Sequence, residues 1–157
     1  LIDQVSDNLI MKGYDARNCF IITVSTDYSS IAGQIIRHNL SFDGEIACGF
    51  GIDVPYPDEN WDTENLHKNM ETQFSSNIEL FRNMTPVLVE AGVIRGSNYT
   101  HIVNWMKDNL YLPNGVITLA LFENSESLFK SDIVGKYYDA KKEDLEFWWE
   151  KYNKHWL

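Results

Sequence analysis

Two short apolar runs constrain the fold of this chain more than any other feature of its sequence. The first run is Phe20–Val24 and the second is Val116–Phe122, which only Thr118 interrupts. Both are rich in β-branched residues, as buried strands are. Neither approaches the roughly 20 apolar residues that a membrane-spanning helix requires. The two runs therefore predict buried β-strands in a protein that is not inserted in a membrane.

Helical periodicity surrounds these runs. Apolar residues recur at three- and four-residue spacing in five segments, which predict helices near residues 2–11, 27–39, 62–81, 97–110 and 139–156. Asp27, Asp62 and Asp139 stand where N-caps are expected. The dipeptide Asp43-Gly44 predicts a tight turn between two short strands, 39–42 and 45–53.

Two segments are harder to assign. Thr85-Pro86 is typical of a helix start, so residues 87–91 are predicted as a short helix that Gly92 ends, with a strand as the alternative. Residues 128–134 are predicted to pair with the strand at 116–122 through a polar loop. The mixed order of elements predicts a single α+β domain over residues 1–157, with a small, largely antiparallel sheet packed against about five helices.

The 157 residues carry a net charge of −10, and most of it is concentrated. Between Asp43 and Glu79 lie nine acids and one base, Lys68, so this window holds −8 of the total. A negative surface repels phosphate backbones. Direct nucleic-acid binding is therefore not expected. For the same reason a helix-turn-helix over residues 85–110 is disfavoured, since Lys107 is the only lysine or arginine on its second helix.

Aromatic side chains accompany the acids, and together they suggest a protein-binding surface. Tyrosine and tryptophan at a charged rim are typical of binding hot spots. The leading hypothesis is a non-enzymatic, acidic module that docks onto a basic surface of a partner protein, as an inhibitor that imitates nucleic-acid charge would. The residues expected to bind the partner are Tyr56, Asp58, Glu59, Trp61, Asp62, Glu64 and Glu71. The competing interpretation is a solvated acidic face, with Trp61 packed on the following helix.

Two alternatives remain open. One is a small hydrolase or transferase that uses the strand-to-helix loop Ser25–Ser30, where hydroxyls and a helix N-terminus suit a phosphate. That loop has no glycine-rich cradle and no following lysine, and Asp27 stands where the anion would bind. The other alternative is a structural subunit of a larger assembly, held through the aromatic face of residues 145–156.

No catalytic residue, metal ligand or cofactor site is predicted. Glu64, His67 and Glu71 share one helix face, but that face lies off the apolar stripe. No serine or cysteine is placed beside a histidine by any motif. Cys19 and Cys48 are expected to be buried, reduced thiols. This cysteine usage favours a cytoplasmic location.

Overall fold

The computed structural model describes residues 1–24, 27–54, 63–139 and 141, and they form a five-stranded sheet in which every pair of neighbouring strands is parallel. The strand order is β2-β1-β3-β4-β5. The strands are β1 (Cys19–Val24), β2 (Gly49–Ile52), β3 (Thr85–Val93), β4 (Ile117–Asn124) and β5 (Ile133–Tyr138). The prediction of a largely antiparallel sheet was wrong, and the protein has an α/β rather than an α+β architecture.

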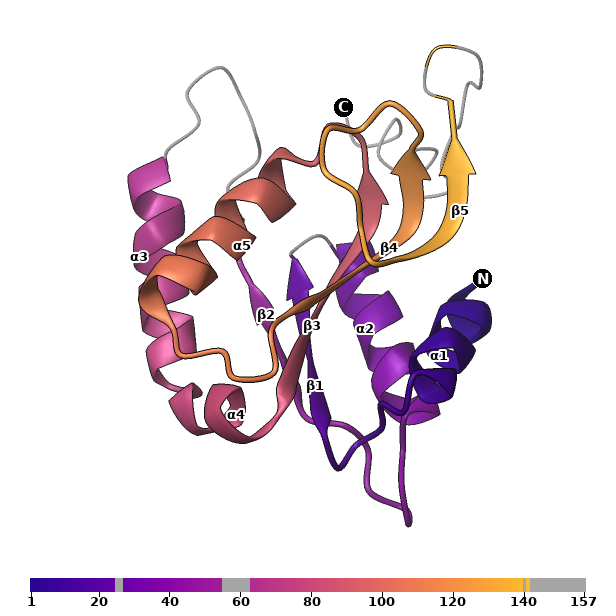
Figure 1. Ribbon diagram of the computed structural model, residues 1–157, viewed down its shortest axis with the longest axis vertical. Coiled ribbons are helices and arrows are strands. Elements are labelled where there is room, and N and C mark those ends of the chain that lie inside the picture. The colour runs from indigo at the N-terminus through magenta and orange to yellow at the C-terminus, as the bar shows by residue number, and fades with distance from the viewer. Residues whose placement is uncertain (25–26, 55–62, 140, 142–157) are drawn as a thin grey trace.

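Helices cover both faces of this sheet (Figure 1). On one face lie α1 (Ile2–Met11) and α2 (Asp27–Asn39). On the other face lie α3 (Thr63–Ser75), α4 (Ile78–Asn83) and α5 (Ser97–Asn109). The helices therefore change faces after β2, because the chain passes from β1 to β2 on one side and then to β3 on the other side of β1.

Each face has its own apolar core. Alternate residues of one strand enter different cores, so that Phe20, Ile22 and Val24 of β1 pack under α3, α4 and α5, while Cys19 and Ile21 pack under α1 and α2. All six residues of β1 are buried. Burial on both faces explains why the strand sequences read as continuous apolar runs without polar alternation.

Strand β3 replaces the short helix that was predicted for residues 87–91. The misleading signal was Pro86, which cannot donate a hydrogen bond and is usually excluded from central strands. Pro86 is tolerated because it stands near the start of β3, opposite Phe20 of β1, while pairing with β4 begins one residue later at Val87 and Ile117. The helix-turn-helix alternative fails for the same reason, since its first helix is a strand.

The other local predictions had mixed outcomes. Asp43 and Gly44, with φ of 50° and 83°, do form the predicted tight turn, but Phe42 and Glu45 make only an isolated antiparallel bridge. β2 instead pairs with β1 in parallel. Residues 128–132 belong to the connection between β4 and β5, and β5 lies parallel to β4.

The long helix predicted for residues 62–81 is divided in two between Ser75 and Ile78. Three consecutive side chains around the break turn back to bond backbone carbonyls four residues earlier: Ser75 to Glu71, Ser76 to Thr72 and Asn77 to Gln73. Such side-chain bonds compete with the backbone and favour helix ends. Phe74 and Phe81 remain on the same apolar face and make edge contacts, with ring centroids 5.2 Å apart.

Strand β3 continues past the end of its pairing with β1, and beyond that point its backbone bonds to a side chain of α2. The last β1 partner of β3 is Thr23, opposite Val89. Two residues later, the backbone N–H of Ala91 donates to the Oγ atom of Ser29, in the first turn of α2, at 3.0 Å. The first turn of α2 is thus joined directly to the carboxyl end of β3.

Replacing Ser29 with alanine is expected to lower the free energy of unfolding by about 2 kcal/mol, because the buried N–H of Ala91 loses its acceptor. Urea denaturation of wild type and variant measures the difference. Ser125→Ala is the matched control, since its side chain lies on an exposed loop. A loss of stability no greater in Ser29→Ala than in this control would show that the bond contributes nothing.

Two further predictions concerned membrane-spanning helices and the two cysteines. No described helix is long and apolar enough to cross a membrane. Both cysteines are free: Cys19 is buried, as predicted, and burial raises the pKa of its thiol to about 12. Cys48 is exposed, contrary to prediction, because it precedes the edge strand β2.

Candidate functional site

The carboxyl ends of β1 and β3 mark the place where this fold can best hold a ligand. The segments that leave these neighbouring strands lead to helices on opposite faces, α2 after β1 and α5 after β3. In open parallel sheets a crevice forms at such a switch point, and ligands bind there. The extension of β3 beyond β1 forms part of this edge.

An open pocket of about 620 Å³ lies at this position, around the segment that connects β3 to α5. Its lining comes almost entirely from one stretch of chain: Glu90, Gly92, Val93, Ile94, Arg95, Gly96, Ser97, Asn98 and His101. We call residues 94–96 the β3–α5 loop. Gly96 adopts the left-handed conformation with φ of 82°, which turns the chain from the strand into the helix.

The N-terminus of α5 opens onto this pocket. Gly96 is the N-cap residue, and it has no side chain to bond the free backbone N–H groups of the first turn. Those N–H groups and the helix dipole together favour an anion. The first turn of α5, at Ser97 and Asn98, is therefore an electrostatically favourable place for a negatively charged group.

A carboxylate, Glu90, stands beside this anion-binding end. Its Oε1 atom accepts a hydrogen bond of 2.9 Å from Nδ2 of Asn98, in the first turn of α5. Burial raises the pKa of Glu90 to about 7, and the bond from Asn98 only partly offsets that rise. Glu90 thus changes its charge near neutral pH, which is unusual for a carboxyl group and typical of functional sites.

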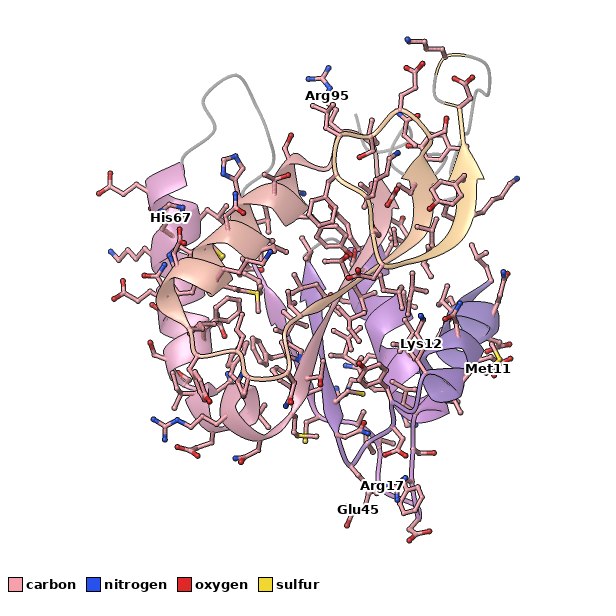
Figure 2. All side chains as sticks on the ribbon, viewed as in Figure 1. Met11, Lys12, Arg17, Glu45, His67 and Arg95 are labelled. Atoms are coloured by element: carbon pink, nitrogen blue, oxygen red, sulfur yellow. The ribbon has the colours of Figure 1, made fainter. Side chains whose placement is uncertain are left out.

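Arg95 is the cation of the pocket. Its side chain is exposed and extends beyond the carboxyl ends of the strands, as Figure 2 shows. Arg17 and Glu45 lie at the opposite end of the sheet (Figure 2). An arginine next to a helix N-terminus adds a second means of binding phosphate, because its planar guanidinium matches two phosphate oxygens.

The residues predicted to bind a partner protein lie elsewhere or outside the described residues. Glu64 and Glu71 are exposed on α3. His67 lies on the same helix, well away from Arg95 (Figure 2). The other predicted residues are Tyr56, Asp58, Glu59, Trp61 and Asp62, and all five lie outside the described residues. No group of histidine, cysteine and carboxylate side chains suited to a metal is found in the described part of the chain.

The loop Ser25–Ser30, which was the alternative candidate, follows the neighbouring strand at the same edge of the sheet. Ser25 and Thr26 lie outside the described residues. Ser29 is fully buried and bonds to β3, so its hydroxyl has a structural partner. The phosphate argument applied to this loop fits the β3–α5 loop better, because that loop has a glycine N-cap and an arginine.

Comparison with known proteins identifies the fold. No family model matches the sequence, and no curated protein matches it either. Solved structures do match. A hypoxanthine phosphoribosyltransferase from Staphylococcus aureus superposes with a TM-score of 0.59 at 11% identity, covering 88% of this chain and 74% of its own. A purine phosphoribosyltransferase from Pyrococcus horikoshii gives 0.56 at 12% identity, with coverage of 88% and 80%. The xanthine-guanine-hypoxanthine phosphoribosyltransferase of Helicobacter pylori gives 0.53 at 13% identity, with coverage of 98% and 90%.

The chain therefore has the α/β fold of type I phosphoribosyltransferases. This result corrects the functional hypothesis as well as the fold. These neighbours are enzymes that act on purines, so the expectation of an acidic, inhibitor-like module that docks onto a basic partner protein was wrong. Of the predicted binding residues, the two that are described, Glu64 and Glu71, do not line the pocket at the β3–α5 loop.

One sequence signal could have found this site. Val87–Val89 is a short apolar run, and two glycines and a helix start follow it within ten residues, at Gly92, Gly96 and Ser97. A buried strand, a glycine turn and a helix N-terminus in that order are typical of phosphate binding. The signal was missed because the run was assigned to a helix.

Proposed function

We propose that this protein binds a phosphorylated ribose compound in the pocket at the β3–α5 loop and takes part in phosphoribosyl transfer. The observation that carries the proposal is the combination, within one pocket, of a helix N-terminus without a side-chain cap, an arginine and a carboxyl group whose pKa burial raises to about 7. The binding part depends on this site, and the transfer part depends on the likeness of fold.

The phosphate is assigned to the N-terminus of α5. Backbone N–H groups of residues 97 and 98 would donate to its oxygens, and the guanidinium of Arg95 would close over it from the loop. Gly96 adopts the left-handed conformation that turns the chain so that the first N–H groups of α5 face the pocket.

The role assigned to Glu90 is to bind hydroxyl groups of the sugar. A carboxylate repels a phosphate but accepts hydrogen bonds from hydroxyl groups. A ligand that carries phosphate at one end and hydroxyls at the other satisfies both halves of the pocket, as ribose 5-phosphate does. Inorganic phosphate alone would leave Glu90 unused and should bind more weakly.

Calorimetric titration tests the binding. Ribose 5-phosphate and 5-phosphoribosyl 1-pyrophosphate should bind, and ribose without phosphate should not. Transfer is tested separately by adding hypoxanthine or guanine and following the ultraviolet absorbance of the base. In that reaction the bond from C1 to pyrophosphate breaks, a bond from C1 to a base nitrogen forms, and the nitrogen loses its proton. Binding without turnover would retain the site and reject the transfer; no binding would reject both.

Arg95→Ala is expected to weaken the binding of ribose 5-phosphate by about tenfold or more, because a charge-assisted hydrogen bond is lost. The matched control is Arg82→Ala, which removes the same charge from an exposed ion pair with Glu79 on α4. Titration of both variants should show a loss in the first only. Equal affinities would indicate that Arg95 does not contact the phosphate.

A further inference from the structure

We propose that Glu123 is a positioning residue for this site: it anchors the segment of residues 125–132 against the β3–α5 loop and so holds that loop in its binding conformation. The identity of the ligand in this inference rests on the proposed function. The contacts from which the inference is argued do not depend on that function. Segment 125–132 connects β4 to β5 and runs from the carboxyl end of β4 back to the start of β5 (Figure 1).

Glu123 is an unusual residue for the interior of a sheet. It lies in β4, opposite Val93 of β3, and its side chain is fully buried. Its Oε2 atom accepts a hydrogen bond of 2.9 Å from the backbone N–H of Ser131. Its Oε1 atom has no hydrogen bond among the described residues and faces Nζ of Lys130 at 4.0 Å. Both partners of this carboxylate belong to the same segment.

Lys130 extends the anchor along the segment. Besides facing Glu123, its Nζ atom donates a hydrogen bond of 2.9 Å to the carbonyl oxygen of Ser125. The two ends of the segment are thereby tied to one buried charge. Without Glu123, Lys130 would keep its hydrogen bond to Ser125 but lose the charge that ties it to β4.

The anchored segment packs directly on the β3–α5 loop. Just before the segment, Asn124 at the end of β4 donates from Nδ2 to the carbonyl oxygen of Ile94 at 3.2 Å. A Cβ atom built on Gly96 would lie 2.3 Å from Cβ of Phe129 and 2.9 Å from Oγ of Ser127, so the loop and the segment are in close contact there. The ring of Phe129 also lies 5.2 Å from that of the buried Tyr99, on α5. The segment therefore forms the back of the loop that would hold the phosphate.

The chemistry favours a positioning role over a stabilising one. A buried carboxylate with a lysine at 4.0 Å costs desolvation that the ion pair does not fully recover, so an apolar or neutral residue would often be as stable. The charge orients Lys130 and Ser131, and through them the whole segment. Removing it should loosen the site more than it unfolds the protein.

The test compares three variants of the whole chain. Glu123→Gln keeps the size of the side chain and an oxygen for Ser131 but gives up the charge that holds Lys130. Lys130→Met removes the other partner at a position whose side chain is 55% exposed, so the methionine needs no room in the core, and urea denaturation shows how much stability is lost when Glu123 is left without its cation. Lys141→Met is the matched control, because Lys141 pairs with Glu126 of the same segment at 2.7 Å, but on the exposed surface.

Two measurements are made, one without ligand. Amide hydrogen exchange of the free protein should become faster by about tenfold at residues 94–98 and 125–131 in Glu123→Gln and Lys130→Met, and stay unchanged at residues 20–24. Affinity for ribose 5-phosphate should fall about tenfold in the same two variants, and neither quantity should change in Lys141→Met.

Unchanged exchange at residues 94–98 in both variants would overturn the inference. Faster exchange throughout the sheet would also overturn it, since Glu123 would then be merely structural. If the wild-type protein does not bind ribose 5-phosphate, the proposed function fails on its own, and the exchange measured without ligand still decides whether Glu123 positions the loop.

Discussion

Replacing Gly96 with alanine should lower the free energy of unfolding by about 3 kcal/mol and abolish binding at the β3–α5 loop. Two causes add together. An alanine at φ of 82° is strained by about 1–2 kcal/mol. Its Cβ atom would also lie 2.3 Å from Cβ of Phe129, so backbone or core must shift, which costs a further 1–3 kcal/mol or so.

Gly115→Ala separates the two causes. Gly115 has a similar φ of 71°, but a Cβ atom there would meet nothing within 4 Å. Urea denaturation should therefore show a loss of only about 1 kcal/mol for Gly115→Ala, from backbone strain alone. Equal losses in the two variants would mean that the contact between the loop and Phe129 is not close in solution.

Replacing Glu90 with glutamine should remove a pH dependence from the stability of the protein. The pKa of Glu90 is raised from 4.5 in the unfolded chain to about 7 in the fold, because burial disfavours its charge. Between these two values the folded state binds more protons than the unfolded state, so stability falls as pH rises. The contribution of Glu90 to the free energy of unfolding is fully present below pH 4.5 and is lost above pH 7.

The magnitude follows from the shift. A change of this size corresponds to a loss on the order of 3 kcal/mol between pH 4.5 and pH 8. Denaturation midpoints measured over that range should fall less steeply for Glu90→Gln, which should be the more stable protein at pH 8. Glu64→Gln, on the exposed surface of α3, is the control for the loss of one carboxylate. Parallel pH profiles for wild type and Glu90→Gln would contradict the burial of this charge.

Much of the helical structure could be predicted from the sequence, and so could the strands at residues 20–24 and 116–122, but the direction and pairing of the strands could not. The helices near residues 2–11, 27–39 and 97–110 follow from three- and four-residue periodicity, which is a local property. Strand direction is not local. Strand β1 pairs with β3 across 60 residues or more, and nothing in the run Phe20–Val24 specifies a parallel partner. A continuous apolar run is the local sign of a strand in a parallel sheet. A short run of this kind fits a helix equally well, as at Val87–Val89.

The site was missed for a related reason. Charge is the most visible property of this sequence, and it favoured the acids between Asp43 and Glu79, of which Glu64 and Glu71 do not line the pocket at the β3–α5 loop. The residues that line the pocket are inconspicuous in the sequence: two glycines, two apolar residues, and one each of glutamate, arginine, serine, asparagine and histidine. Their importance depends on the place where β3 ends, and that place is known only once β3 is recognised as a strand.

The residues that line the pocket all lie between positions 90 and 101, where the chain passes from β3 into α5. No other described segment contributes to the lining. This arrangement has a consequence for how such proteins diverge. The exposed residues of that stretch, Ile94, Arg95 and Ser97, can be substituted to change what is bound while the two apolar cores, which take only Ala91, Val93 and Tyr99 from it, stay intact. Conversely, other core residues can be substituted while the turn between β3 and α5 is kept. The solved structures that share this fold do so at 11–13% identity, so the fold tolerates the replacement of nearly all of its residues.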